Sequence, residues 1–272
     1  MGARRQVDEV AAGESSRRRF LAAGGLVGAT LLAGCAARDP GAPAERGSSD
    51  SAAELGARPE AQPSASTGDP APGVRPLGLE PTGDPLLYVP AGLTAGAAAG
   101  LVLSLHGAGG DAAAGLGLFQ SLADERGLVL LAPASRGPTW DAIGGSYGAD
   151  AESIDRALRR VFATVRVDPD RVAVAGFSDG GSYALGLGLA NGDLFGRVVA
   201  FSPGFVPRGP RNGQPAVFVS HGDADDVLPV DRTSWQIVPA LREDGYDVTY
   251  REFAGPHTVP PEIAREAADW LG

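Results

Sequence analysis

Short apolar runs alternate with longer amphipathic segments from residue 74 to residue 272. The apolar runs have the length of buried strands, and the amphipathic segments have apolar residues at helical spacing. This alternation is typical of a mostly parallel α/β sheet with helices on both faces. It predicts strands at residues 86–89, 101–105, 129–132, 172–177, 198–201, 216–220 and 248–253, with a weaker first strand at 77–80.

The longer segments predict helices at residues 112–124, 153–165, 182–190, 233–243 and 261–271. In the second of these, Asp155, Arg156 and Arg159 alternate with apolar residues at helical spacing, which gives one solvated face and one buried face. We therefore expect a single domain at residues 74–272, with a sheet of about eight strands. The short connections between the strands leave no room for a large lid.

The first 34 residues have the features of a targeting signal. Arg17, Arg18 and Arg19 precede an apolar run at residues 21–33, which is too short to span a bilayer comfortably. The arginines resemble a twin-arginine export signal, and residues 32–35 (Leu-Ala-Gly-Cys) resemble a lipobox. The sequence thus predicts an exported, cell-envelope protein that is anchored to a membrane by a lipid on Cys35.

Residues 35–73 have a different composition, rich in Ala, Gly, Pro and Ser. Leu55 is the only large apolar residue between residues 36 and 73. A segment of this composition cannot bury enough apolar surface to fold alone. We therefore expect a disordered tether between the acylated cysteine and the domain.

The charged and metal-binding residues exclude several classes of function. The net charge of −10 argues against a nucleic-acid partner, and all 23 basic residues are arginine. Without lysine, the chain has no P-loop lysine and no Schiff-base lysine. One cysteine and three histidines are too few for a structural zinc site, and no disulfide can form within the chain. We therefore expect no metal and no cofactor.

Residues 176–180 (Gly-Phe-Ser-Asp-Gly) join a predicted buried strand to a predicted helix. This is the Gly-x-Ser-x-Gly pattern in the context of a nucleophile elbow, with Ser178 at the turn. Gly176 and Gly180 would allow the strand and helix to approach closely. The alternative is a glycine-rich turn that contains an incidental serine.

Two other strand ends carry the groups that a catalytic serine needs. The strand at 216–220 is followed by His221 and a loop with three carboxylates, and the strand at 248–253 is followed by His257. A serine needs a base, and an imidazole base needs a carboxylate that fixes its tautomer. The order serine, acid, histidine is the order in this type of fold. We predict Ser178 as nucleophile and His257 as base, with Asp223, Asp225 and Asp226 as candidate acids.

Residues 106–111 (His-Gly-Ala-Gly-Gly-Asp) follow the strand at 101–105 and are similar to an HGGG-type oxyanion loop. The N–H groups of Ala108 and Asp179 are the predicted oxyanion donors. The side chain of Asp179 is expected to act only as a carboxylate at a helix N-terminus. His106 and His221 are expected to support their loops.

Trp140 and Tyr147 lie in a glycine-containing loop after the strand at 129–132. They are candidates for lining the substrate cleft. The alternative is that Trp140 fixes the loop to the sheet.

Five blocks in order carry a family resemblance: residues 105–109, 136–141, 176–180, 221–225 and 255–257. From residue 74 to the end, the chain resembles α/β-hydrolases of the phospholipase/carboxylesterase group. It is also similar to the polyhydroxybutyrate-depolymerase-like esterases. The resemblance implies hydrolysis of small or polymeric carboxylic esters, or of thioesters, by a serine and without a cofactor. It also implies Asp225 as the acid, although this chain has Asp226 where the family usually has proline.

Other functions on this fold remain open. An exopeptidase or amidase would use the same triad, as would a thioesterase. A non-catalytic lipoprotein that uses the fold as a binding module is a further alternative. Such a protein tends to lose a member of the triad, whereas this sequence retains a candidate for each.

Overall fold

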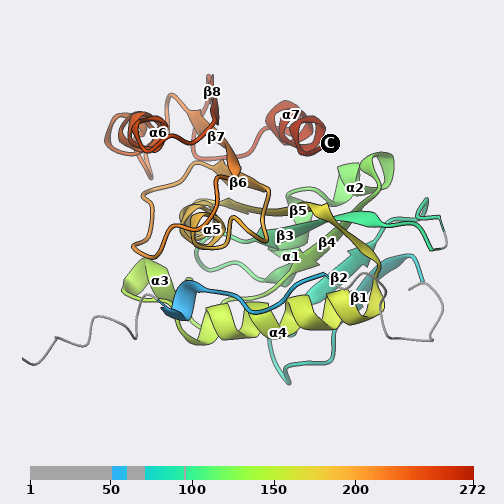
Figure 1. Cartoon of the computed structure of the whole chain (residues 1–272). Helices are drawn as coiled ribbons and strands as arrows, with labels where there is room; N and C mark the ends of the chain where they lie inside the picture. Colours follow the sequence, from blue (N-terminus) through green and yellow to red (C-terminus); the bar gives the residue numbers. More distant parts are fainter. Residues whose placement is uncertain (1–50, 60–70, 95) are drawn as a thin grey trace, which may run out of the picture. The chain divides into compact units, whose positions relative to one another are not determined.

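The computed structural model describes residues 51–59, 71–94 and 96–272, and the predicted signal at 1–34 and Cys35 lie outside these residues. The described chain forms one eight-stranded sheet in the order β1-β2-β4-β3-β5-β6-β7-β8 (Figure 1). The β1–β2 and β2–β4 pairs are antiparallel, and the remaining pairs are parallel. The strands are β1 (Gly73–Pro76), β2 (Leu86–Val89), β3 (Ala99–Leu105), β4 (Leu128–Ala132), β5 (Val167–Phe177), β6 (Arg197–Phe201), β7 (Ala216–Gly222) and β8 (Val248–Phe253).

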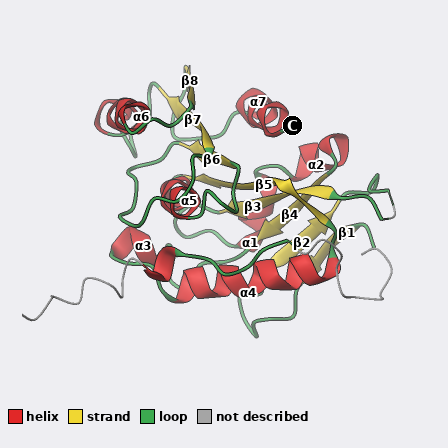
Figure 2. Cartoon of the chain, viewed as in Figure 1, coloured by secondary structure: helices red, strands yellow, loops and turns green. Residues whose placement is uncertain are grey.

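Helices cover both faces of the sheet, as Figure 2 shows. One hydrophobic cluster joins the sheet to α4, α5 and α6, and a second joins it to α1, α2 and α7. β3 and β4 are buried along their whole length because both of their faces are covered. This architecture confirms the predicted fold class. The helices are α1 (Ala112–Gly117), α2 (Gln120–Arg126), α3 (Asp141–Gly144), α4 (Ala149–Thr164), α5 (Asp179–Ala190), α6 (Ser234–Glu243) and α7 (Pro261–Leu271), with 3₁₀ turns η1 (Ser51–Ala53) and η2 (Val230–Arg232).

The first strand was predicted at residues 77–80, but this segment is a loop, and β1 ends at Pro76. The carboxylate of Asp84 explains the difference. It accepts hydrogen bonds from the N–H groups of Gly78, Leu79 and Glu80. These donors are therefore satisfied by a side chain, as in a turn, and not by a neighbouring strand.

The helix predicted at 112–124 is divided into α1 and α2. The break lies at Leu118 and Phe119. Phe119 is fully buried, and its ring lies 5.8 Å from that of Phe201 on β6. The amphipathic pattern is continuous across residues 112–124, so it does not show that the helix breaks at this point. The buried contact between Phe119 and Phe201 lies at the break.

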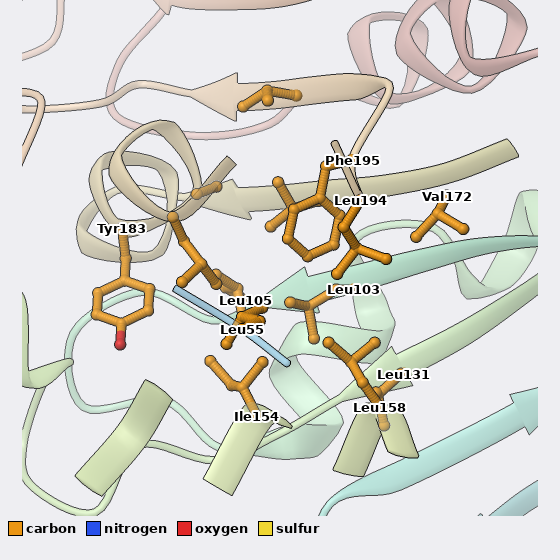
Figure 3. Packing of buried hydrophobic residues seen from close by; sticks show 14 of the residues in the cluster. Leu55, Leu103, Leu105, Leu131, Ile154, Leu158, Val172, Tyr183, Leu194 and Phe195 are labelled. Atoms are coloured by element: carbon orange, nitrogen blue, oxygen red, sulfur yellow. The ribbon is translucent and has the colours of Figure 1, made fainter. Parts of the chain in front are cut away.

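Residues 51–59 lie against the domain, although they were predicted as part of a disordered tether. Leu55 is 4% exposed and belongs to the same hydrophobic cluster as Ile154 and Leu158 of α4 (Figure 3). The side-chain amide of Asn191 accepts the N–H of Leu55 and donates to the carbonyl of Ala53. The tether prediction is therefore wrong for these residues, because specific polar partners fix a segment whose own composition is not apolar.

None of the helices in the described ranges is both long and apolar enough to cross a membrane.

Candidate active site

Ser178 lies at the sharp turn between β5 and α5, the helix that begins at Asp179. Its backbone has φ 58° and ψ −121°, a conformation that costs free energy for a residue with a side chain. The chain can make this turn because residue 176 is glycine. A Cβ atom at this position would overlap the carbonyl of Gly180. A Cβ on Gly180 would overlap the carbonyls of Leu105 and His106 on β3 and the loop that follows it. Both glycines are therefore required by close backbone packing.

The structure brings Ser178, His257 and Asp225 together from three different strand ends. The Nε2 atom of His257 lies 2.9 Å from the Oγ of Ser178, and its Nδ1 lies 2.6 Å from the Oδ2 of Asp225. The ring of Phe177 packs 4.7 Å from the imidazole of His257. His257 is thus held between a hydroxyl and a carboxylate in hydrogen-bonding geometry.

The carboxylate of Asp225 is fully buried and is fixed by the loop after β7. Its Oδ1 accepts the N–H groups of Val227 and Leu228 at 3.0 and 2.8 Å, which leaves Oδ2 for His257. Burial favours the protonated acid, but the hydrogen bonds from Leu228 and His257 outweigh burial and hold the pKa of Asp225 below its ordinary value. Asp225 is therefore an anion at neutral pH.

The other two candidate acids point elsewhere. Asp223 is exposed, and its Oδ1 accepts the N–H of Gly255 at 3.0 Å. This bond joins the loop after β7 to the loop that carries His257. A Cβ on Gly222 would overlap the carbonyls of Gly255 and Pro256, so a glycine is needed where the two loops meet. Asp226 is exposed to solvent.

The loop after β3 lies directly beside Ser178. A Cβ on Gly107 would lie 3.4 Å from the Cβ of Ser178. No hydrogen bond among the described residues uses the N–H of Ala108, the next residue. Asp179 is the first residue of α5, so its N–H has no acceptor within the helix. The two predicted oxyanion donors therefore belong to backbone segments that adjoin the serine.

His106 holds this loop in place. Its Nδ1 lies 2.7 Å from the carbonyl of Gly107, and its Nε2 accepts the N–H of Ser135 at 3.0 Å. The indole of Trp140 donates to the carbonyl of His106 at 2.9 Å and packs 4.7 Å from its ring. The side chain of Asp179 accepts the hydroxyl of Thr139 at 2.6 Å. The loop after β4 thus supports both the loop after β3 and the turn at Ser178.

Trp140 and Tyr147 are buried, with exposed fractions of 1% and 5%. Both rings pack against Tyr183 of α5. The hydroxyl of Tyr147 has no partner among the described residues, and burial raises its pKa. This burial argues against a substrate-cleft role for either residue and favours the alternative, in which Trp140 fixes the loop to the sheet.

Two exposed apolar side chains at the same edge of the sheet were not among the predicted site residues. Phe205 follows β6 and is 42% exposed, and Val227 follows β7 and is 61% exposed. The two loops adjoin, because a Cβ on Gly204 would lie 3.4 Å from the side chain of Leu228. Their position after strand ends could have marked them as candidate site residues. Their exposure could not be predicted, because the sequence shows only that both residues are apolar.

The chain is similar to known esterases over part of its length. The esterase family model, described as "Putative esterase", matches residues 155–243. "Putative esterase NocK" of Nocardia uniformis subsp. tsuyamanensis is 32% identical over 149 residues, which cover 49% of this chain and 42% of that protein. "Acyl-protein thioesterase 1" of Gibberella zeae is 28% identical over 113 residues, 38% of this chain and 48% of that protein. The chain thus spans less than half the length of these curated relatives.

Solved structures match a larger part of the chain. Esterase PE8 superimposes with a TM-score of 0.56 at 26% identity, and the match covers 68% of this chain and 95% of that one. The S-formylglutathione hydrolase FrmB of Staphylococcus aureus has a TM-score of 0.56 at 16% identity over 69% of this chain and 92% of that one, which supports the fold alone. The chain is therefore an α/β-hydrolase in fold, and the proteins that it resembles in sequence are esterases and thioesterases.

Proposed function

We propose that the protein hydrolyses carboxylic esters through an acyl-enzyme on Ser178. One observation carries the proposal: Asp225, His257 and Ser178 form a continuous hydrogen-bonded series with distances of 2.6 and 2.9 Å. The series lies at the carboxyl edge of the parallel strands, where ligands of open α/β sheets bind. Its buried acid, its imidazole and its strained serine are the three parts of an activated nucleophile.

In the first half of the reaction, the Oγ of Ser178 attacks the ester carbonyl while the Nε2 of His257 accepts the hydroxyl proton. Asp225 stabilises the imidazolium that forms. The N–H groups of Ala108 and Asp179 donate to the carbonyl oxygen as it gains negative charge. His257 then gives the proton to the leaving alcohol as the bond between the carbonyl carbon and the alcohol oxygen breaks, which leaves the acyl group on Ser178.

In the second half, His257 removes a proton from water, and the water oxygen attacks the acyl carbonyl. The tetrahedral adduct collapses, the proton returns from His257 to Oγ, and the carboxylic acid leaves. Phe205 and Val227 are exposed apolar side chains at this edge, and we propose that they contact the acyl group.

A thioester is the second candidate substrate, since the chain matches acyl-protein thioesterases of several fungi over part of its length. The same series of groups would carry out either reaction. The two candidates differ in the leaving group, a thiol or an alcohol, so a matched substrate pair separates them.

The test uses wild-type protein and Ser178→Ala with nitrophenyl esters, acyl thioesters and aminoacyl anilides of equal acyl length. We expect the highest kcat/KM on the esters, and a fall in kcat on the order of 10⁶ in Ser178→Ala. A fluorophosphonate probe should label wild type and not the variant. Equal ester turnover in the two proteins would contradict the proposal, and preference for the anilides would indicate an amidase.

A further inference from the structure

His221 lies at the end of β7 and is fully buried. Its Nδ1 is 2.7 Å from the hydroxyl of Ser234, the first residue of α6. Its Nε2 is 2.7 Å from the carbonyl oxygen of Leu228 and 3.1 Å from the Oδ2 of Asp225. The imidazole of His221 takes no part in the proposed reaction, although it contacts the same carboxylate oxygen as His257.

The partners of His221 determine its tautomer. A carbonyl and a carboxylate only accept hydrogen bonds, so the nitrogen that faces both must carry the proton. Nε2–H therefore donates to Leu228 and Asp225 together, and Nδ1 accepts the hydroxyl proton of Ser234. The opposite tautomer would place a lone pair of Nε2 against two oxygen atoms in a buried site, which is unfavourable.

The surroundings also keep His221 neutral. Burial lowers its pKa from the ordinary value, and the hydrogen bonds to Leu228 and Asp225 offset only part of this effect. The titratable groups that face it are Asp225 and, beyond the carboxylate, His257. A neutral donor stabilises the Asp225 anion without placing a second cation beside the imidazolium of His257.

We propose that His221 is a positioning residue, which acts through Asp225 and is itself oriented by Ser234. Asp225 accepts hydrogen bonds from four donors. The N–H groups of Val227 and Leu228 donate to Oδ1, and the imidazoles of His221 and His257 both donate to Oδ2. His221 therefore limits rotation of the Asp225 carboxylate away from His257, and its hydrogen bond reduces the negative charge on Oδ2 of Asp225. The inference rests on the proposed function and extends the hydrogen-bonded series to the N-terminus of α6.

The test compares His221→Leu, which removes the donor, with His221→Gln, which retains a side-chain N–H. Ser234→Ala removes only the partner of Nδ1. Val217→Ala, also on β7 and buried but remote from the imidazole, is the control for lost stability. Each variant is assayed on a nitrophenyl ester for kcat and KM across pH, and its thermal unfolding is measured.

We expect His221→Leu to lower kcat roughly tenfold to a hundredfold, by analogy with the loss when a hydrogen-bond partner of a metal-bound side chain is removed. KM should not change, because His221 is buried. Without the donor, Oδ2 carries more negative charge toward His257 and stabilises its imidazolium, so the acidic limb of the kcat/KM profile should move to higher pH. His221→Gln should recover most of the activity, and Ser234→Ala should show the same changes at smaller size.

The inference is overturned if His221→Leu has the profile of Val217→Ala, or if His221→Gln is no more active than His221→Leu. If His221→Leu does not fold, Ser234→Ala decides in the same way against Val217→Ala. Nitrogen NMR of wild type adds a readout that is independent of turnover: the Nε2–H tautomer of His221 supports the inference, and the Nδ1–H tautomer overturns it. If the wild-type protein showed neither ester turnover nor fluorophosphonate labelling, the proposed function would instead be contradicted.

Discussion

Asp225 and Asp226 are neighbours with the same side chain, yet the fold gives them opposite surroundings. The carboxylate of Asp225 is buried between two backbone N–H groups and two imidazoles, whereas Asp226 is in solvent. Once Oδ1 of Asp225 is bound by Val227 and Leu228, the position of Oδ2 is determined. The geometry of the turn, and not the residue type, therefore determines which carboxylate contacts His257.

The first prediction compares the three carboxylates of this loop. Asp225→Asn should lower kcat on the order of 10⁴-fold, because an amide N–H toward His257 favours the wrong tautomer. Asp226→Asn should keep nearly full activity. Asp223→Ala should act mainly on stability, with a loss of about 1 kcal/mol for the broken bond to Gly255. Ester turnover and denaturant unfolding measure these effects, and a large loss of kcat in Asp226→Asn alone would contradict the assignment.

The sequence could predict Ser178 and His257 because Ser178 directly follows one strand and His257 lies in the loop that follows another. The choice of Asp225 among three acids depended on a family resemblance, since the spacing fits all three. The pairing of His221 with Ser234 could not be predicted. Ser234 is 13 residues further along the chain, and its contact with His221 exists only because α6 begins beside the end of β7.

At the scale of elements, the elbow depends on three segments that touch through their backbones. β5 and α5 meet at Ser178, and the loop after β3 lies against Gly180. The positive φ of Ser178 persists because these contacts leave no room for a relaxed turn.

The second prediction is that Gly180→Ala will damage both the fold and the site. Its Cβ would overlap backbone carbonyl oxygens of Leu105 and His106, so we expect a loss of about 3 kcal/mol in unfolding free energy and most of the ester activity. Gly117→Ala is the matched control, since no atom lies within 4 Å of its Cβ in α1. That change should stabilise the protein by up to about 1 kcal/mol. Similar stability of the two variants would show that the elbow tolerates a side chain.

Most helices and strands were predictable from periodicity, but the short helix α3 and several boundaries were not. β5 begins at Val167, five residues before the predicted strand, because Val167 pairs with Ala99 beyond an irregularity in the ladder. α4 begins at Ala149, and its early residue Asp150 is buried. The carboxylate of Asp150 accepts the N–H groups of Arg136 and Asp141. Both extensions depend on partners distant in sequence, which a local pattern does not contain.

At the scale of the whole molecule, residues 51–59 pack against the domain, although composition predicted that the domain begins at residue 74. Besides the bonds of Asn191, the Oδ1 of Asp155 accepts the N–H groups of Gly56 and Ala57, both at 2.7 Å. Arg58 forms an ion pair with Asp193. Most strands were predictable because they contain an apolar run, whereas this segment is held mainly by partners on α4 and at the end of α5.

The third prediction compares two N-terminal truncations. Removal of residues 1–59 should lower the unfolding free energy by roughly 2–4 kcal/mol relative to removal of residues 1–50. The loss comes from exposure of the buried Leu55 and from the hydrogen bonds of Asn191 to Ala53 and Leu55. The kcat values on a nitrophenyl ester should agree, because the hydrogen-bond and ion-pair partners of this segment do not belong to the loops that carry Ser178, Asp225 and His257; they are Asp155, Asn191, Asp193 and Asn212. Equal unfolding curves would show that the segment adds nothing to stability.

Trp140 is an intrinsic fluorophore in contact with the loop after β3. Its indole is buried, donates to the carbonyl of His106 and packs against that ring, whereas Trp235 is 52% exposed and Trp270 lies on α7. Emission from a buried indole is sensitive to a neighbouring imidazole and to changes in local polarity. In a protein with phenylalanine at positions 235 and 270, the light emitted by Trp140 would report the ordering of this loop as an inhibitor reacts with Ser178, without any attached dye.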